Sequence, residues 1–162
     1  MKNIIIVDMQ NGFINQNNNF LVDRINDYLQ KNTFDNIIVT KYINNEQSPF
    51  VKILNYTSLM TSKEQELAVH IPENNKITIF EKYGYGLTEQ MINKLKDLGI
   101  EEIEICGTDS DACVMAIAYN LFDSGIKPII LKDMIGSSSK NTKLTDYSLQ
   151  IMARSFGKDN II

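Results

Sequence analysis

Short apolar runs alternate with amphipathic stretches along the whole sequence, and this alternation restricts the fold more than any other feature. The first run, Asn3–Met9, is apolar almost throughout, as expected for a strand buried on both faces. The next stretch, Phe20–Lys31, has apolar residues at helical spacing, and Asn36–Tyr42 is a second short apolar run. Short strands that alternate with helices in this way predict βαβ units and a parallel sheet.

The same alternation continues to the last residues. The further predicted strands are Lys76–Phe80, Glu101–Gly107, Lys127–Leu131 and Asn160–Ile162. The further predicted helices are Phe50–Met60, Lys63–Val69, Thr88–Leu98, Ser110–Ser124 and Leu144–Ser155. A length of 162 residues is typical of one domain, so residues 1–162 are predicted to form a single domain.

Composition argues against several classes of function. The single histidine, His70, rules out zinc hydrolase sites that need two or three histidines. Two cysteines, Cys106 and Cys113, are too few for a disulfide framework. A formal net charge of −4 argues against a nucleic-acid partner. The first apolar run stops at Asp8 and no stretch approaches the roughly 18 apolar residues that span a bilayer, so we expect no signal peptide, no membrane partner and a cytoplasmic location.

Three reactive side chains follow three of the predicted strands. Asp8 follows the first strand, Lys82 follows Lys76–Phe80, and Cys113 lies in the first turn of the helix after Glu101–Gly107. Chemistry collects at the carboxyl ends of parallel strands, so we expect these groups to converge. A helix N-terminus and a nearby ammonium both favour a thiolate, whereas the flanking Asp109 and Asp111 disfavour one. The pKa of the Cys113 thiol is predicted to lie below its ordinary value if Lys82 outweighs these two carboxylates.

A carboxylate, an ammonium and a thiol can together hydrolyse an acyl compound without a histidine. The thiolate attacks, the ammonium orients the reacting group, and the carboxylate carries the proton to a leaving amine. Each residue also has an ordinary interpretation: Asp8 as a turn residue, Lys82 as a solvated side chain and Cys113 as an inert thiol. Ser110 is the predicted N-cap of the helix, and Cys106 is predicted to pack inside its strand.

Three motifs resemble those of the isochorismatase-like cysteine hydrolase superfamily, which includes nicotinamidases and N-carbamoylsarcosine amidases. They are Ile5–Phe13 (IIVDMQNGF), Lys82–Thr88 (KYGYGLT) and Gly107–Val114 (GTDSDACV), in the family's order and spacing. The resemblance extends over nearly the whole chain. It implies a three-layer α-β-α fold with a six-stranded, mostly parallel sheet, and often a homo-oligomer.

The resemblance also implies roles for single residues. The family's catalytic aspartate, lysine and cysteine correspond to Asp8, Lys82 and Cys113. Its oxyanion hole corresponds to the backbone N–H groups of Asp109 and Cys113, and the bond Thr108–Asp109 corresponds to a cis peptide in the family.

The substrate is predicted to be a small molecule. Phe13 corresponds to an aromatic wall of the family's pocket, and Tyr83 and Tyr85 follow Lys82 closely enough to line the same cleft. Ordinary packing is the alternative for all three aromatic side chains. We expect specificity to depend on Phe13 and on the regions Asn44–Phe50 and Tyr83–Thr88.

Differences between this sequence and the family motifs limit the reactions that we expect. Nicotinamidases carry an Asp-x-His metal motif after the second strand, whereas Thr40–Glu46 contains no histidine, so we predict no metal and no cofactor. Isochorismatases that cleave a vinyl ether lack the cysteine, so Cys113 favours hydrolysis of an amide or carbamoyl C–N bond. The family has a small residue at the position of Asp109. This difference leaves open a non-catalytic binding or scaffold protein on the same fold.

Overall fold

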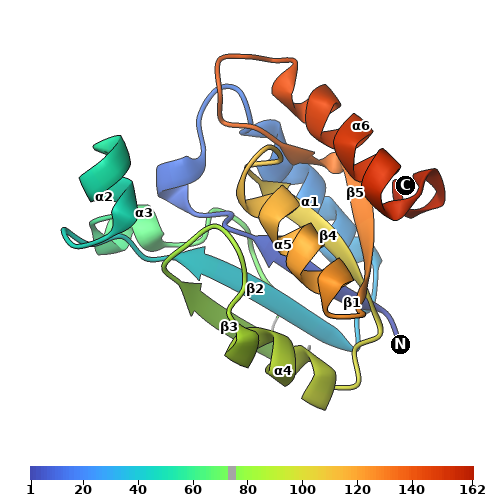
Figure 1. The fold of residues 1–162 in the computed structure, drawn as a ribbon. Helices are drawn as coiled ribbons and strands as arrows, with labels where there is room; N and C mark the ends of the chain where they lie inside the picture. Colours follow the sequence, from blue (N-terminus) through green and yellow to red (C-terminus); the bar gives the residue numbers. More distant parts are fainter. Residues whose placement is uncertain (73–75) are drawn as a thin grey trace.

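A parallel sheet of five strands lies at the centre of the computed structural model, which describes residues 1–72 and 76–162 (Figure 1). The strand order is β3-β2-β1-β4-β5. The strands are β1 (Asn3–Val7), β2 (Asn36–Tyr42), β3 (Ile77–Lys82), β4 (Glu102–Thr108) and β5 (Lys127–Gly136). All four neighbouring pairs are parallel, as the alternation of strands and helices predicts.

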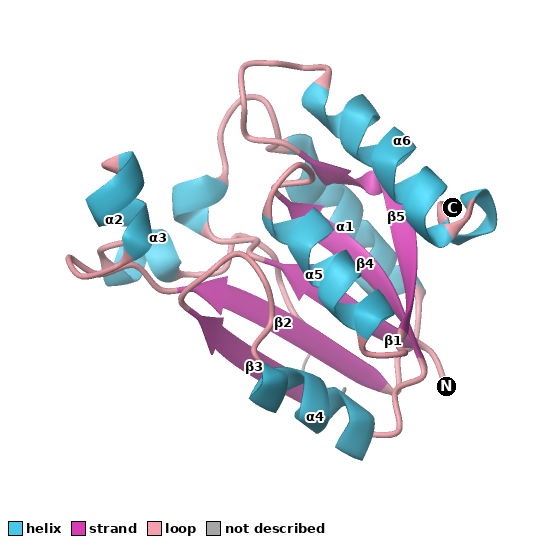
Figure 2. Cartoon of the chain, viewed as in Figure 1, coloured by secondary structure: helices cyan, strands magenta, loops and turns pink. Residues whose placement is uncertain are grey.

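Helices cover both faces of this sheet and give the molecule three layers (Figure 2). The helices are α1 (Phe20–Lys31), α2 (Pro49–Leu54), α3 (Ser62–Gln65), α4 (Glu89–Asp97), α5 (Cys113–Asp123) and α6 (Leu144–Phe156), with 3₁₀ turns η1 (Asn11–Phe13) and η2 (Lys158–Asn160). The apolar stripe of α1 packs on one face, and those of α4, α5 and α6 pack on the other. The predicted α/β layering is therefore confirmed.

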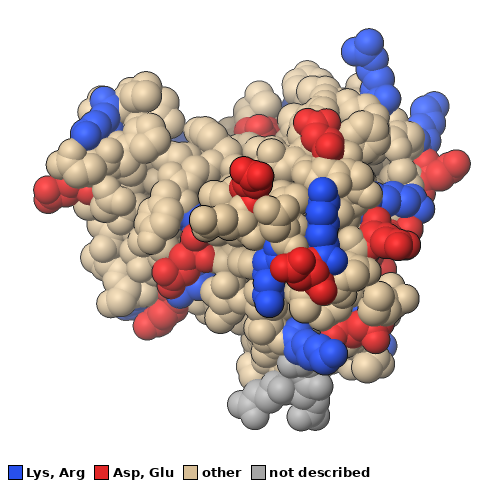
Figure 3. Space-filling view, turned by 60° about the horizontal axis from the view of Figure 1, so that its bottom comes forward, with Lys and Arg blue, Asp and Glu red and all other residues tan. Residues whose placement is uncertain are grey.

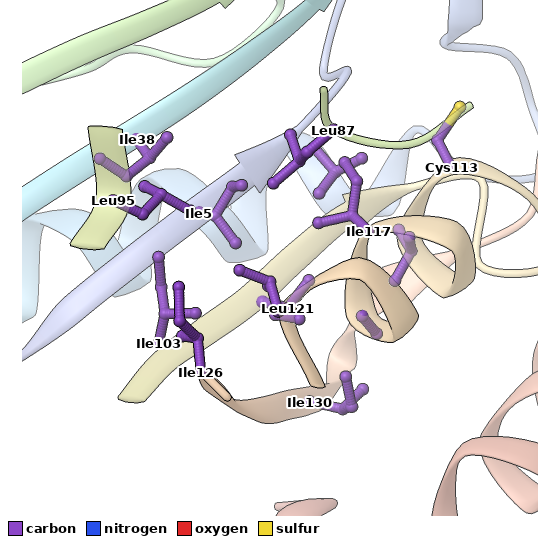
Figure 4. Close-up of a cluster of buried hydrophobic side chains, with 14 of the residues drawn as sticks. Ile5, Ile38, Leu87, Leu95, Ile103, Cys113, Ile117, Leu121, Ile126 and Ile130 are labelled. Carbon is purple, nitrogen blue, oxygen red and sulfur yellow. The ribbon is translucent and has the colours of Figure 1, made fainter. Parts of the chain in front are cut away.

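The central strand β1 is buried along its whole length, because apolar clusters cover it on both sides. Ile5 points into one cluster and pairs in register with Ile38 of β2 and Ile105 of β4. Figure 4 shows this cluster between the sheet and α5, with Ile117 inside it and Cys113 at its edge. The apolar core thus fixes the place at which α5 begins.

The prediction of a sixth strand is wrong for the residues that the structure describes. The segment Asn160–Ile162 was expected to join the sheet, but it meets β5 at a single parallel bridge between Ile130 and Ile161. Two backbone hydrogen bonds accompany the bridge, one from the N–H of Ile162 to Ile130 and one from Lys132 to Ile162. Residues 158–160 close into the turn η2, which leaves too few extended residues for a ladder.

The two predicted helices between β2 and β3 are much shorter than expected. The Ser48 side chain accepts from the N–H of Val51 and starts α2, and Asn55, in the left-handed conformation with φ 52°, ends it. A capping box between Thr61 and Glu64 starts the single turn of α3. These local signals, which the apolar pattern does not contain, set both lengths.

The topology brings the carboxyl ends of all five strands to one edge of the sheet. After β1 the chain builds outward through β2 and β3, and β4 then returns to the other side of β1. The carboxyl ends of β1 and β4 are therefore neighbours at the point where the strand order reverses, which is the usual place for a ligand in open α/β sheets. The segment with α2 and α3 lies at the same edge, beside the end of β2 (Figure 1).

The surface carries no strong segregation of charge on the face drawn in Figure 3, where acidic and basic side chains are interspersed. In the described parts of the chain, no helix has both the length and the apolar character needed to cross a membrane.

Candidate active site

Asp8 directly follows β1 and lies at the reversal of strand order. It is buried, with a positive φ of 50°, and its backbone N–H donates to the Thr40 side chain. The hydroxyl of Thr40 in turn donates to Asp8 Oδ1 over 2.6 Å. Among the described residues, Oδ2 has no hydrogen-bond donor apart from the Lys82 ammonium. One carboxylate oxygen is therefore held by the scaffold and the other faces the site.

Lys82, the last residue of β3, directs a buried ammonium into the same space. Its Nζ lies 2.7 Å from Asp8 Oδ2 and 3.4 Å from Cys113 Sγ. The same nitrogen donates to the carbonyl oxygens of Gly84 and Tyr85 at 2.8 and 3.2 Å. Every proton of the ammonium thus has an acceptor, as a buried charge requires.

The loop that supplies these two carbonyls is held by Asn120 of α5. The N–H of Leu87 donates to Asn120 Oδ1 over 2.8 Å. A Cβ atom at Gly86 would lie only 2.1 Å from the same oxygen, so the close approach requires a glycine there. The helix that carries Cys113 therefore also positions the loop that holds Lys82.

Cys113 is the first residue of α5, and its side chain is buried. The N-cap position belongs to Ala112 and no side chain caps the helix, so the prediction that Ser110 is the N-cap is wrong. Instead the N–H of Ser110 donates to the carbonyl of Gly136, which ties the turn to β5. Cys106, as predicted, packs inside β4.

The charge state of the thiol differs from the prediction. Burial raises the pKa of the Cys113 thiol above its ordinary value, the Asp8 carboxylate raises this pKa further, and Lys82 only partly opposes them. Burial would lower the pKa of Lys82, but Asp8 and Cys113 together raise it above its ordinary value. The protonated thiol is therefore favoured beside the Asp8–Lys82 ion pair. The sequence pattern could not predict this, because it does not show how deeply the thiol is buried.

The turn between β4 and α5 carries the two backbone N–H groups that the resemblance singled out. The peptide bond Thr108–Asp109 is cis. The N–H of Val114 donates to the carbonyl of Asp109, whereas the N–H groups of Asp109 and Cys113 donate to no acceptor in the part of the chain that the structure describes. Both donors are therefore free to bind a ligand oxygen.

A cavity of about 230 Å³ opens in front of Cys113. It is lined by Phe13, Tyr42, Phe50, Leu54, Tyr56, Tyr85, Asp109, Ala112, Cys113 and Ser138. The predicted pocket residues Phe13 and Tyr85 are in this lining. Tyr83 is not, because it lies in the bend after the end of β3 and its side chain is 58% exposed.

Sequence reasoning missed several residues of the lining. Tyr42 ends β2, Tyr56 follows α2, and Ser138 follows β5. Tyr42 could have been predicted from the sequence, because it lies at the carboxyl end of a predicted strand, the same feature that singled out Asp8. The part of Asn44–Phe50 that reaches the cavity is Phe50.

Solved structures with the same fold were found by comparison. The chain superposes on the pyrazinamidase of Pyrococcus horikoshii, solved in complex with zinc, with a TM-score of 0.77 and 21% identity over 96% of each chain. It superposes on the N-carbamoylsarcosine amidase of Thermoplasma acidophilum with a TM-score of 0.78 and 18% identity, over 97% of this chain and 94% of the other. At these identities the comparison shows a shared fold.

The residues near the cavity do not fit a metal ion. Within residues 1–72 and 76–162, no three His, Cys, Asp or Glu side chains lie close enough together to hold one. In the stretch after β2, the Asn44 amide donates to the carbonyls of Tyr56 and Ser58, and its oxygen accepts from the Tyr42 hydroxyl. A neutral amide that is already hydrogen-bonded is a poor metal ligand.

Sequence comparison agrees with the fold. The chain is 25% identical to isochorismatase family protein 1A of Dictyostelium discoideum over 144 residues, which cover 87% of this chain but only 66% of that protein, just under two thirds of its length. The isochorismatase domain model matches residues 2–158. The chain therefore belongs to the isochorismatase family.

Proposed function

We propose that this chain is a cysteine hydrolase that cleaves an amide or carbamoyl C–N bond of a small molecule through a thioester. The observation that carries the proposal is the position of the buried Lys82 ammonium, 2.7 Å from Asp8 Oδ2 and 3.4 Å from the Sγ atom of Cys113, which lines the cavity. Family membership and the fold shared with amidases support hydrolysis of this kind of bond.

The first step moves a proton from the Cys113 thiol to Asp8 Oδ2 while sulfur attacks the substrate carbonyl carbon. The proton transfer alone leaves the net charge of the three side chains unchanged, because the proton passes from one of them to another. The attack of sulfur then moves the negative charge onto the substrate oxygen. A thiol with a raised pKa does not readily lose its proton to solvent, but it can still react by passing the proton to Asp8 once a substrate fills the cavity. The free N–H groups of Asp109 and Cys113 suit the oxygen anion that forms on the carbonyl.

The second step breaks the C–N bond and completes the cycle. The tetrahedral adduct collapses to a thioester on Cys113, and Asp8 returns its proton to the departing amine. Asp8 then takes a proton from water, whose oxygen attacks the thioester carbonyl. The acid product leaves, the proton returns to sulfur, and the free enzyme is restored.

The remaining expectations belong to the same proposal. The substrate is a small molecule, since the cavity has a volume of only about 230 Å³. The cytoplasmic location and the homo-oligomer stay predictions.

Ammonia release from a panel of small carboxamides and carbamoyl compounds tests the proposal. The rate of turnover of any substrate found should fall by about a thousandfold or more in Cys113→Ala, because this change removes the nucleophile. Cys106→Ala is the matched control, because it removes the other buried thiol and leaves the cavity intact. Undiminished turnover in Cys113→Ala would contradict the proposal. Failure of the whole panel would favour the non-catalytic binding protein instead.

A further inference from the structure

The cavity in front of Cys113 is an aromatic box. Rings from three separate parts of the chain line it: Phe13 after β1, Tyr42 at the end of β2, and Phe50 with Tyr56 around α2. Their centroids lie 4.7 to 6.4 Å apart, and Tyr85 extends the series at 4.7 Å from Phe50. Faces of aromatic rings are regions of negative potential that attract cations.

Asp109 is the one charged side chain in the described lining of this box. Its Oδ1 accepts from the N–H of Ser138 at 2.6 Å and from the Thr108 hydroxyl at 2.5 Å, and its Oδ2 accepts from the Ser138 hydroxyl at 2.8 Å. A carboxylate has about four acceptor sites, so these three hydrogen bonds fix its orientation and leave acceptor capacity for a ligand. Within the described residues, no lysine or arginine forms an ion pair with it.

The other charges near the cavity cancel one another. Lys82 and Asp8 form a buried ion pair behind the thiol, which leaves the charge of Asp109 without compensation. Burial and then the charge of Asp109 are among the causes that raise the pKa of Tyr56 to about 12, so this ring stays a neutral phenol. Apart from the free N–H groups of Asp109 and Cys113, the uncompensated charge that faces the box is therefore negative, which disfavours an anionic group beside Asp109.

We propose that the box selects a small amide that carries a positive charge, such as a quaternary or protonated ammonium group, which lies against the rings and faces Asp109. This inference rests on the proposed function for the hydrolysis step, and it adds the class of substrate. An amide with a carboxylate at the same place would meet Asp109 and is excluded.

Two amides of matched shape test the inference. Trimethylammonioacetamide has a positively charged quaternary nitrogen where 3,3-dimethylbutanamide has a neutral quaternary carbon. The two amides have the same shape, so a difference in their affinities reports the effect of the charge. Binding of each is measured by calorimetry on the unreactive Cys113→Ala variant. We expect the cation to bind at least about tenfold more tightly than the neutral amide, a difference of about 1.4 kcal/mol.

Asp109→Asn in the same background should remove most of this preference, because the variant keeps the side-chain oxygen for Ser138 and loses the charge. Asp111→Asn is the matched control, since Asp111 is exposed, lies outside the cavity lining and should leave the preference unchanged. Equal binding of the two amides, or a preference that survives in Asp109→Asn, would overturn the inference.

Turnover by the wild-type chain separates the two proposals. Tight, Asp109-dependent binding of the cation without Cys113-dependent ammonia release from any amide would support the box and contradict the hydrolase. Release from neutral and anionic amides as fast as from the cationic amide would support the hydrolase and contradict the box.

Discussion

Replacing Lys82 with methionine should destabilise the fold far more than breaking an ion pair of equal length at the surface. The Lys82–Asp8 pair spans 2.7 Å with side chains 1% and 0% exposed, and the Lys127–Glu102 pair spans 2.8 Å with side chains 53% and 55% exposed. Lys82→Met keeps the aliphatic stem and leaves the Asp8 carboxylate buried without its counter-charge. The loss of one partner of a buried pair costs about 3–5 kcal/mol, whereas the loss of an exposed pair costs about 0–1 kcal/mol.

The measurement is the free energy of unfolding from urea titrations at pH 7, on wild type, Lys82→Met, Asp8→Asn and the double variant. Lys127→Met is the surface control. The double variant should be more stable than the sum of the two single losses predicts, because no uncompensated charge remains in it.

A loss in Lys82→Met no larger than that in Lys127→Met would refute the reasoning. It would mean that water or another group compensates the charge of Asp8, and that the site is not the closed, coupled cluster on which the proposed proton transfer depends. Strict additivity in the double variant would contradict the direct ion pair.

Other consequences of the geometry are testable by unfolding experiments. Gly107→Ala should cost about 3 kcal/mol or more, because φ is 119° and the added Cβ would lie 2.2 Å from the carbonyl oxygen of Val7; stability within about 1 kcal/mol of wild type would contradict this. Asn120→Ala should cost about 1–3 kcal/mol in urea titrations, because it leaves the N–H of Leu87 without its acceptor, whereas Asn120→Asp keeps an acceptor and should cost less. Burial raises the pKa of both thiols in the folded state, so an unfolded chain loses these protons first and stability should fall above about pH 8.5, by up to about 1.4 kcal/mol per pH unit for each thiol. Cys106→Ala should roughly halve that slope between pH 8.5 and 10, and an unchanged slope would show that the thiols are not its source.

Much of the fold could be predicted from the sequence because the sheet is buried on both faces. A strand such as Asn3–Val7, covered on both sides, is apolar in all but its first residue, and this pattern is visible without a structure. The ends of α2 and α3 depend on single caps such as Asn55, and the fate of Asn160–Ile162 depends on one turn, so periodicity alone does not predict them.

Some features of the candidate site could likewise be predicted from the sequence and others could not. Asp8, Lys82 and Cys113 could be found because strand ends are readable and parallel strands end at one edge. The charge state of the thiol could not, because it depends on burial and on distances among three side chains from distant parts of the chain. The side-chain network of Asp109 with Ser138 was equally hidden, since it joins residues that follow different strands.

The central claim is that Cys113 carries the acyl group during turnover. Mass spectrometry of enzyme quenched in acid during steady-state hydrolysis of any amide that the chain turns over tests this claim most directly. We predict a mass increase equal to the acyl group, mapped to the peptide that contains Cys113 and absent from the one that contains Cys106. Turnover that continues in Cys113→Ala, with no acyl group found on wild-type Cys113 at any time of quenching, would contradict the account.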